Sequence, residues 1–408
     1  MDFDLDTFIA EHVTERAESM FQRDLERFSG ALSKGIRGKR ALVIGGAGSI
    51  GSAFIKELLC FEPEELTVVD TNENGLTELT RDLRSGSDIP VPAAGKYRTY
   101  PMNYASPEFK KLFRAEKGFD IVANFSAHKH VRSEKDIFSV EALIRNNLLN
   151  ARELLLLLEE YPPEVYFCVS TDKAANPVNI MGASKRVMED MIFSFSDCFP
   201  VKTARFANVA FSNGSLPDGF LQRIAKKQPL TAPLDIKRYF VSPGEAGQIC
   251  LLSCMLGGNR EVFFPKLDAS SMKGFDEMAK ELLKTLGYEP LLCSSEEEAK
   301  KAGRFISAAS RRYPLYLFSS DTSGEKPYEE FYTEDESVDW ERFESLGVIT
   351  EAAVRGIPER NRVFALLDNL EKCFLGDNAS KEAVVSLLAA YLPEFHHLET
   401  GKNLDGKM

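Results

Sequence analysis

The sequence has little of what would mark a metal-binding or secreted protein. Its 408 residues include only five histidines, which are scattered, and seven cysteines, none of which form a C-x-x-C pair. Cys250 and Cys254 lie one helical turn apart in an apolar stretch, and we interpret them as buried structural thiols rather than metal ligands. We therefore expect a reducing compartment and no metal site.

Long apolar runs are also missing. A membrane-spanning helix needs roughly 20 apolar residues, whereas the longest candidate here, residues 154–158, ends at Glu159 and Glu160. The N-terminus is acidic and has no apolar core, which is unlike an export signal. We expect a cytoplasmic protein with no membrane span.

The sequence has fewer positively charged than negatively charged residues. Lysine and arginine number 50 against 62 aspartates and glutamates, so the formal net charge is −12. A chain of this sign repels a phosphate backbone, and we exclude DNA and RNA as partners. The hydrophobic fraction of 44% is that of an ordinary globular protein, and the length suits one large domain with a smaller one.

From residue 39 onward, short apolar runs alternate with amphipathic segments. The runs predict strands at 41–44, 66–69, 98–102, 121–125, 165–169 and 201–206. The segments between them predict helices at 52–59, 76–83, 107–113, 140–158 and 185–195. This alternation predicts the α/β class, with a Rossmann-type, doubly wound parallel sheet covered on both faces. Ligands of such sheets bind beyond the carboxyl ends of the strands.

The pattern divides the chain into four regions. We predict a helical arm at 1–38, a Rossmann domain at 39–210, a smaller mixed substrate-binding region at 211–345 to which part of the sheet returns, and a C-terminal helical extension at 346–408. The arm carries apolar residues at helical spacing and a mixed, acidic polar face. It must pack on the body of the chain or on a second copy rather than on a membrane surface.

A glycine-rich loop follows the first predicted strand. Its glycines, Gly45, Gly48 and Gly51, permit a tight turn, close approach of a pyrophosphate and helix–strand packing, and the next helix begins there. Asp70 ends the following strand about 20 residues on, where it can bind both ribose hydroxyls of a dinucleotide. No arginine follows Asp70 directly, so NAD is favoured over NADP. Ser49 and Ile50 complete the predicted cofactor loop.

The stretch Ser170-Thr171-Asp172-Lys173 places a hydroxyl, an acid and a base together at the end of an apolar run. Lys185 follows on a predicted helix. Such a group suits acid–base chemistry on a bound substrate. The competing interpretation is a salt-bridged Asp-Lys turn without a catalytic role.

Several ordered motifs resemble one family. The G-x-x-G-x-x-G spacing resembles the extended short-chain dehydrogenase/reductase superfamily, and within it the run STDKAANPVNIMGASKR is similar to the CapD-like nucleotide-sugar 4,6-dehydratases. The resemblance covers roughly residues 39 to 335. Further matches are AHKHV at 127–131, RFANV at 205–209, RYF at 238–240 and GEK at 324–326.

The resemblance implies a concealed redox cycle on a nucleotide-linked hexose. NAD oxidises carbon 4, water leaves from carbons 5 and 6, and the hydride returns to carbon 6. Lys173 would be the base at carbon 5, provided that burial and the nearby Lys185 charge lower its pKa. Asp172 would protonate the departing hydroxyl, Thr171 would bond the carbon 4 hydroxyl, and Lys185 would hold the nicotinamide ribose. The other residues that it implies are Ser126 at the cofactor and Lys129, Asn208, Arg238 and Glu325 at the substrate.

The chain departs from the family pattern at three places. Met181 stands where the superfamily has a catalytic tyrosine, so either Asp172 accepts the carbon 4 proton, through Thr171 or water, or the oxidation step is lost. Some relatives with methionine here resemble dehydratases that retain the carbon 5 configuration, so we expect retention. Ser126 lies in an Asn-Phe-Ser run in place of the usual His-Ala-Ala, and Thr322 replaces an arginine.

These departures concern the residues around the cofactor and the nucleotide, so they bear on the choice of substrate. UDP-N-acetylglucosamine is the expected nucleotide sugar, and a GDP-linked or otherwise altered sugar stays open. Two other functions also stay open: a nucleotide-sugar epimerase, and a non-catalytic protein that binds NAD or a sugar nucleotide. We expect a homo-oligomer, because extended short-chain enzymes commonly pair through helices.

Overall fold

The computed structural model describes residues 3–86, 89–129, 134–307, 309–320, 329–350, 358–376 and 379–398. Its main element is a nine-stranded sheet in the order β15-β16-β11-β6-β5-β4-β1-β2-β3. These strands are β1 (Arg40–Ile44), β2 (Glu65–Asp70), β3 (Tyr97–Pro101), β4 (Ile121–Asn124), β5 (Val165–Thr171), β6 (Val201–Phe206), β11 (Glu261–Pro265), β15 (Val338–Asp339) and β16 (Leu346–Ile349).

Seven of these strands are parallel, from β11 through β6, β5, β4, β1 and β2 to β3. Their order is that of a Rossmann sheet, with the switch point between β1 and β4. β16 then pairs antiparallel with β11, and β15 with β16. All four residues of β16 are buried. The boundary predicted at 345/346 therefore adjoins a core strand, and the helical extension begins only after it.

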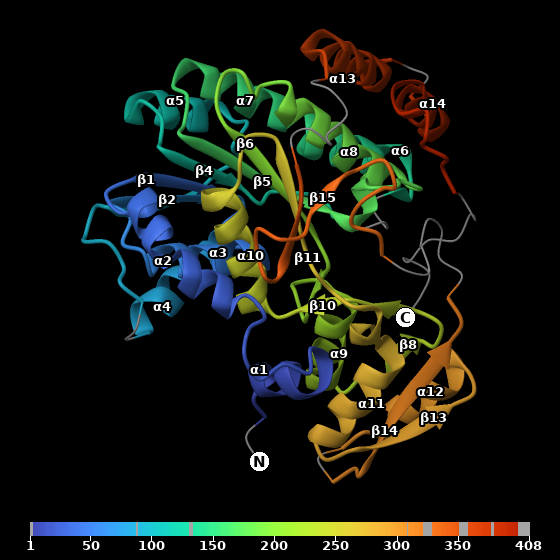
Figure 1. Cartoon of the computed structure of the whole chain (residues 1–408). Helices are drawn as coiled ribbons and strands as arrows, with labels where there is room; N and C mark the ends of the chain where they lie inside the picture. Colours follow the sequence, from blue (N-terminus) through green and yellow to red (C-terminus); the bar gives the residue numbers. More distant parts are fainter. Residues whose placement is uncertain are drawn as a thin grey trace.

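Helices cover both faces of the sheet, as the alternation predicted (Figure 1). One face carries α2 (Gln22–Ile36), α3 (Ser49–Leu59), α4 (Glu73–Ser85) and α10 (Pro243–Leu256). The other carries α5 (Pro107–Glu116), α6 (Ile137–Ile144), α7 (Asn150–Glu160) and α8 (Ile180–Phe193). The segment predicted as one helix at 140–158 contains a π-helical turn at Arg145–Leu149 between α6 and α7. Such turns widen a helix locally and are frequent near functional sites.

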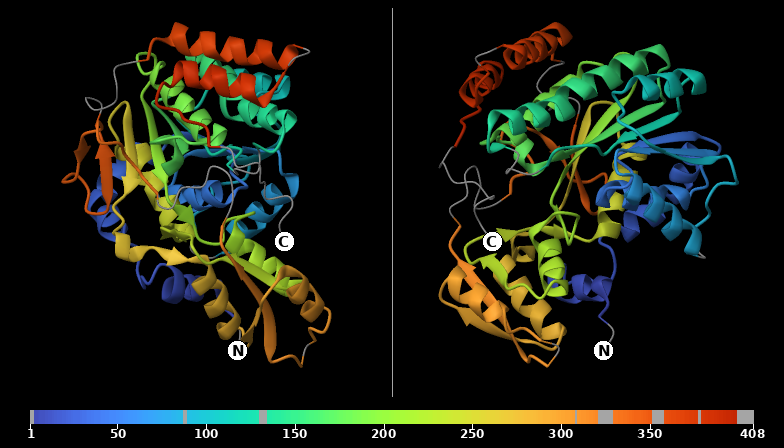
Figure 2. Two further views of the ribbon diagram at one scale, coloured as in Figure 1. Left: turned by 90° about the vertical axis from the view of Figure 1, so that its right-hand side faces the viewer. Right: turned by 180° about the vertical axis from the view of Figure 1, so that it is seen from behind.

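A smaller region lies below the large sheet (Figure 2). Its parallel three-stranded sheet has the order β13-β14-β8, formed by β13 (Glu289–Cys293), β14 (Arg312–Phe318) and β8 (Leu230–Pro233). Its helices are α9 (Leu216–Ala225), α11 (Phe275–Thr285) and α12 (Glu296–Gly303). Short strands join the two regions: β7 (Asn208–Val209), β9 (Lys237–Arg238), β10 (Phe240–Val241) and β12 (Lys273–Gly274).

The N-terminal arm is two helical pieces rather than one. The first piece is α1 (Leu5–Phe8) with a π-turn (Ile9–Val13), and it packs in the core of the smaller region. The chain then breaks at Glu15, whose φ of 53° is left-handed, and α2 packs against α10 of the large region. Arg16 holds the break by donating to both carboxylate oxygens of Glu245, at 2.8 and 2.7 Å. The arm therefore packs on the body of its own chain.

Two C-terminal helices, α13 (Arg360–Leu375) and α14 (Lys381–Tyr391), pack on the outer side of α8 (Figure 2). Arg152 of α7 donates to Asp368 of α13 at 2.8 Å, and Val363, Leu367 and Leu370 are fully buried in the main core. Among the helices within the described ranges, none combines the length and apolar character needed to cross a bilayer.

Candidate active site

The glycine-rich loop forms a tight bend between β1 and α3. Gly45 has a φ of +74°, and a Cβ built there would lie 2.7 Å from the backbone nitrogen of Ser126. A Cβ on Gly51 would lie 2.3 Å from the carbonyl oxygen of Gly45, so a side chain there would push the helix off the loop. Gly48 precedes the first turn of α3 and meets only the Gly45 oxygen, at 3.4 Å. The first turn of α3 can therefore present free N–H groups to an anion, and these residues fit a dinucleotide pyrophosphate.

Asp70 is the last residue of β2 and faces this loop. Its Oδ2 accepts the backbone N–H of Ala47 at 3.0 Å, and its Oδ1 accepts that of Asn72 at 2.9 Å. Each carboxylate oxygen retains lone pairs for a ribose hydroxyl. Ser49 opens α3 and its hydroxyl accepts the backbone N–H of Asn213, while Ile50 packs against the main core. The predicted cofactor residues of this loop thus lie together at the carboxyl edge of the sheet.

The predicted catalytic stretch lies at the end of β5, which is separated from β1 by β4 in the sheet. Thr171 ends the strand, and Asp172 and Lys173 begin a 3₁₀ turn. The Thr171 hydroxyl donates to Asp172 Oδ1 at 2.7 Å, and Lys173 Nζ lies 3.1 Å from each Asp172 oxygen. The Asp172 side chain is 8% exposed and that of Lys173 is 27% exposed. A buried acid, an accessible amine and a hydroxyl are therefore hydrogen-bonded in one cluster.

Helix α8 carries the remaining predicted groups. Met181 is 2% exposed and its side chain belongs to the main apolar core. Lys185 lies one turn later, and its Nζ donates to the carbonyl oxygen of Val169 on β5 at 2.9 Å. Burial lowers the pKa of Lys185. The position of the usual tyrosine is thus apolar, whereas the lysine points at the strand that ends in Thr171.

The structure adds one acid that the sequence analysis missed. Glu329 is buried, with Oε2 accepting the backbone N–H of Tyr239 at 2.7 Å and Oε1 accepting from the amide of Asn208. Burial, together with the charge of nearby Asp172, raises the pKa of Glu329 to about 8. Glu329 lies four residues after the predicted Glu325 in the sequence GEKPYEE. The pair of glutamates at 329 and 330, just after Glu325, was the signal that could have found it.

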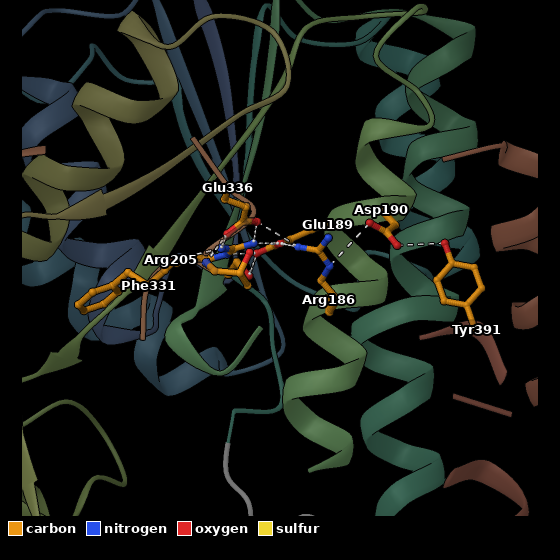
Figure 3. Close-up of polar contacts among 9 residues, drawn as sticks. Arg186, Glu189, Asp190, Arg205, Phe331, Glu336 and Tyr391 are labelled. Atoms are coloured by element: carbon orange, nitrogen blue, oxygen red, sulfur yellow. Dashed lines mark hydrogen bonds and ion pairs between the residues drawn. The ribbon is translucent and has the colours of Figure 1, made fainter. Parts of the chain in front are cut away.

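A charged network holds the Glu329 loop against the sheet. Arg205 on β6 is fully buried and donates to both oxygens of Glu189 and of Glu336, as well as to the carbonyl oxygen of Phe331. Figure 3 shows Arg205 between the two carboxylates. The hydroxyl of Ser170, next to Thr171, donates to Glu189 at 2.6 Å. The network therefore connects β5, α8 and the loop that carries Glu329.

The predicted substrate residues have mixed outcomes. Asn208 and Arg238 lie close to Glu329: Asn208 bonds it directly, and the charge of Arg238 acts on its pKa. Lys129 donates to the hydroxyl of Ser212 at 3.4 Å, and Ser126 bonds Asn124 and Asn146 beside the glycine loop. Glu325 lies outside the described residues, as does Thr322. Within the described ranges, no group of three or more potential metal-ligating side chains is gathered.

The site has the parts for acid–base chemistry beside a dinucleotide. The glycine loop, Asp70 and the Asp172 cluster lie at the carboxyl ends of β1, β2 and β5 in one parallel sheet, and Lys185 of α8 bonds the backbone of β5. Ligands of doubly wound sheets bind at this edge. The hydroxyl of Thr171 can pass a proton to Asp172, and the Lys173 amine can exchange one with a substrate carbon.

Comparison with known sequences places this site in a family. A family model described as polysaccharide biosynthesis protein matches residues 41–351. The "uncharacterized membrane protein MJ1061" of Methanocaldococcus jannaschii is 31% identical over 336 residues, covering 80% of this chain and 90% of that protein. The capsular polysaccharide biosynthesis protein CapD of Staphylococcus aureus is 28% identical over 77% of this chain, which spans 51% of CapD. An inverting UDP-N-acetylglucosamine 4,6-dehydratase of Campylobacter jejuni is 24% identical, covering 74% of this chain and 84% of the enzyme.

Solved structures share the fold. Pen from Bacillus thuringiensis superposes with a TM-score of 0.62 at 20% identity, covering 77% of this chain and 88% of Pen. A UDP-N-acetylglucosamine 4-epimerase from Methanobrevibacter ruminantium has a TM-score of 0.53 at 14% identity, covering 73% and 90% of the two chains. The dTDP-glucose 4,6-dehydratase DesIV of Streptomyces venezuelae, solved with NAD, has a TM-score of 0.50 at 20% identity and covers 68% and 88%.

The sequence motifs, the sheet order and these matches agree. The predicted doubly wound α/β fold and the predicted family are both confirmed. The chain belongs to the polysaccharide biosynthesis protein family.

Proposed function

We propose that the protein removes water from carbons 5 and 6 of a nucleotide-linked hexose, UDP-N-acetylglucosamine in the first instance, to give a 4-keto-6-deoxy sugar with retention at carbon 5. The observation that carries this proposal is the bonded Thr171–Asp172–Lys173 cluster beside the glycine loop. The likeness to the Campylobacter jejuni dehydratase supports the same reaction class.

NAD is the proposed cofactor. When bound, it supplies the oxidation at carbon 4 and the matching reduction at carbon 6. The bend at Gly45, the first turn of α3 and Asp70 would hold its pyrophosphate and adenosine ribose. The Asp70 carboxylate can accept hydrogen bonds from two ribose hydroxyls and would repel a 2′-phosphate. Both properties support NAD over NADP.

The protein's own groups can balance the protons of this reaction. Thr171 takes the proton of the carbon 4 hydroxyl and passes its own to Asp172, to which it is bonded at 2.7 Å. Asp172 then gives that proton to the carbon 6 hydroxyl, which leaves as water. The cycle needs no tyrosine, which agrees with an apolar Met181 at that position.

Lys173 completes the cycle at carbon 5. Its amine, in the free-base form, takes the carbon 5 proton once carbon 4 is a ketone, because the ketone acidifies that proton. The same amine returns the proton to the same face of carbon 5 after carbon 6 has been reduced. A single base on one face supports retention of configuration.

Glu329 supports the acid role of Asp172. A second buried carboxyl beside Asp172 makes two simultaneous negative charges unfavourable, so the pair tends to keep a proton at neutral pH. The charges that face Glu329 are those of Asp172, Lys173 and Arg238. With that proton on Glu329, Asp172 can accept the proton passed by Thr171 and give it to the departing hydroxyl.

The experiment that tests the function is mass spectrometry of UDP-N-acetylglucosamine incubated with the protein and NAD in deuterated water. A dehydratase yields a product that has lost one water and gained one deuterium at carbon 5, and NMR then determines the configuration. An isomer of unchanged mass apart from exchange would identify an epimerase. An unchanged sugar alongside bound NAD would exclude this substrate and favour another sugar or a binding role.

A further inference from the structure

The last described segment of the chain returns to the helix that carries Lys185. We call residues 391–398 the terminal segment; it lies beyond the family match, which ends at residue 351. Its Tyr391 hydroxyl donates to Asp190, near the end of α8, at 3.1 Å (Figure 3). Its Leu398 N–H donates to the carbonyl oxygen of Val178, just before α8 begins, at 2.9 Å. The terminal segment therefore contacts the catalytic helix at both ends.

The terminal segment is part of the hydrophobic core. Leu392 is 4% exposed and Phe395 is 3% exposed, and both belong to the same apolar cluster as Met181. Tyr391 is also tied down, because Arg362 of α13 donates to its carbonyl oxygen at 2.9 Å. Burial of this kind holds the segment in one place relative to α8.

Glu134 connects this segment to the first turn of α8. One of its carboxylate oxygens accepts the backbone N–H of Met181 at 2.8 Å, which is one of the four N–H groups that a helix start leaves unpaired. A negative charge there is also favoured by the helix dipole. The Glu134 side chain is only 6% exposed, so its second oxygen needs a partner as well.

That partner comes from the terminal segment. His397 Nε2 lies 3.5 Å from Glu134 Oε2, and the His397 side chain is 11% exposed. The imidazole also packs on the ring of Phe395, with centroids 6.1 Å apart. Glu134 thus lies between the backbone of the catalytic helix and a histidine more than 200 residues away in sequence.

We propose that His397 is a positioning residue for the reaction: through Glu134 it holds the first turn of α8, and so places Met181 and Lys185 against β5. Its effect on turnover rests on the proposed function, whereas its effect on the helix does not. Lys185 lies one turn after Met181 on α8. Its hydrogen bond to the carbonyl oxygen of Val169 therefore depends on where the first turn of α8 lies along the helix axis and how it is rotated about that axis. A displacement of about 1 Å at such a group can lower a rate by up to roughly 100-fold.

The test compares three variants of the full chain. His397→Ala should lower kcat by roughly ten-fold, with the KM for the nucleotide sugar within about two-fold of wild type, since it disturbs placement rather than substrate contacts. His397→Gln should restore much of the rate, because its amide can donate to Glu134. His396→Ala is the matched control, since His396 is the exposed neighbouring histidine.

Hydrogen exchange gives a second readout that needs no turnover. Amides of a peptide covering residues 178–185 should exchange faster in His397→Ala than in wild type or His396→Ala, while other α8 amides stay protected. Glu134→Gln retains an acceptor for Met181 but removes the charge facing His397, and should show the same local change even if His397→Ala folds poorly.

Two results would overturn the proposal. One is equal kcat and equal exchange at 178–185 in the two histidine variants; the other is a uniform loss of protection along the chain, which would indicate general instability. Failure of the wild type to convert any nucleotide sugar would reject the proposed function instead. The exchange experiment would still decide the role of His397.

Discussion

The cofactor loop and the catalytic cluster lie at the same edge of one sheet, but they are assembled differently. The loop at 45–51 is shaped by its own dihedral angles and by contacts to Asp70 at the end of β2 and to Ser126 just after β4, the two strands that flank β1. The cluster at 171–173 is bonded within itself, but the acid near it, Glu329, comes from a distant part of the chain and is held by Asn208 and the backbone of Tyr239. A motif in sequence therefore describes the first site nearly completely and the second only in part.

The largest expected effect is on the catalytic cluster. Lys173→Ala should lower the rate of water loss by about 10²–10⁴-fold, the range for removal of a positioned acid or base. NAD affinity should stay near wild type, because the glycine loop is untouched. Turnover measured by mass spectrometry in deuterated water checks this, with exposed Lys111→Ala as the control. Full turnover in Lys173→Ala would reject the carbon 5 base.

The buried network is the next most sensitive part. Arg205→Leu leaves the two buried carboxylates of Glu189 and Glu336 with only Arg186, at 3.4 Å from each, which should cost about 3–5 kcal/mol of unfolding free energy. Arg23→Leu removes an exposed ion pair with Glu344 and should cost less than about 1 kcal/mol. Denaturant unfolding of both variants measures the difference. Equal losses would show that the network does not hold the Glu329 loop.

Glu329 should give the cluster a pH-dependent stability. Its folded pKa of about 8 is above its ordinary value of 4.5, so its contribution to stability is present below about pH 4.5 and is lost as the pH rises through 8. Wild type should therefore lose stability relative to Glu329→Gln between about pH 5 and 8, with the gap constant above that. Melting curves across pH test this, with exposed Glu334→Gln as the control. A gap that does not change with pH would contradict the raised pKa.

Two glycine substitutions in the cofactor loop should have different effects, one mainly on stability and the other mainly on NAD binding. Gly51→Ala places a Cβ 2.3 Å from the Gly45 oxygen and should cost about 1–3 kcal/mol of stability. Gly48→Ala meets that oxygen at 3.4 Å, an ordinary contact, and should leave stability nearly unchanged while weakening NAD binding. Melting temperature and NAD titration together distinguish the two variants. A loss of stability in Gly48→Ala equal to that in Gly51→Ala would contradict this reading of the loop.

The N-terminal arm illustrates where periodicity misleads. Apolar residues recur at helical spacing through the whole arm, which predicts a continuous helix. The structure breaks it near Glu15 because Arg16 is held by Glu245 of a distant helix, so the two halves pack on different regions. Spacing reports which residues are buried, but not whether they are buried against one surface or two.

The sequence by itself determined the alternation of strands and helices, the glycine bend, Asp70 and the Thr171–Asp172–Lys173 cluster. Each of these is set by residues close together in the chain, where steric limits and side-chain periodicity act directly. Only the tertiary structure brought Glu329 to Asp172, enclosed Arg205 between two carboxylates and placed His397 beside Glu134. Except for Arg205 and Glu189, which are 16 residues apart on a strand and a helix, those contacts join residues more than 100 positions apart. Packing of the whole chain, and no local rule, decides which of these side chains meet.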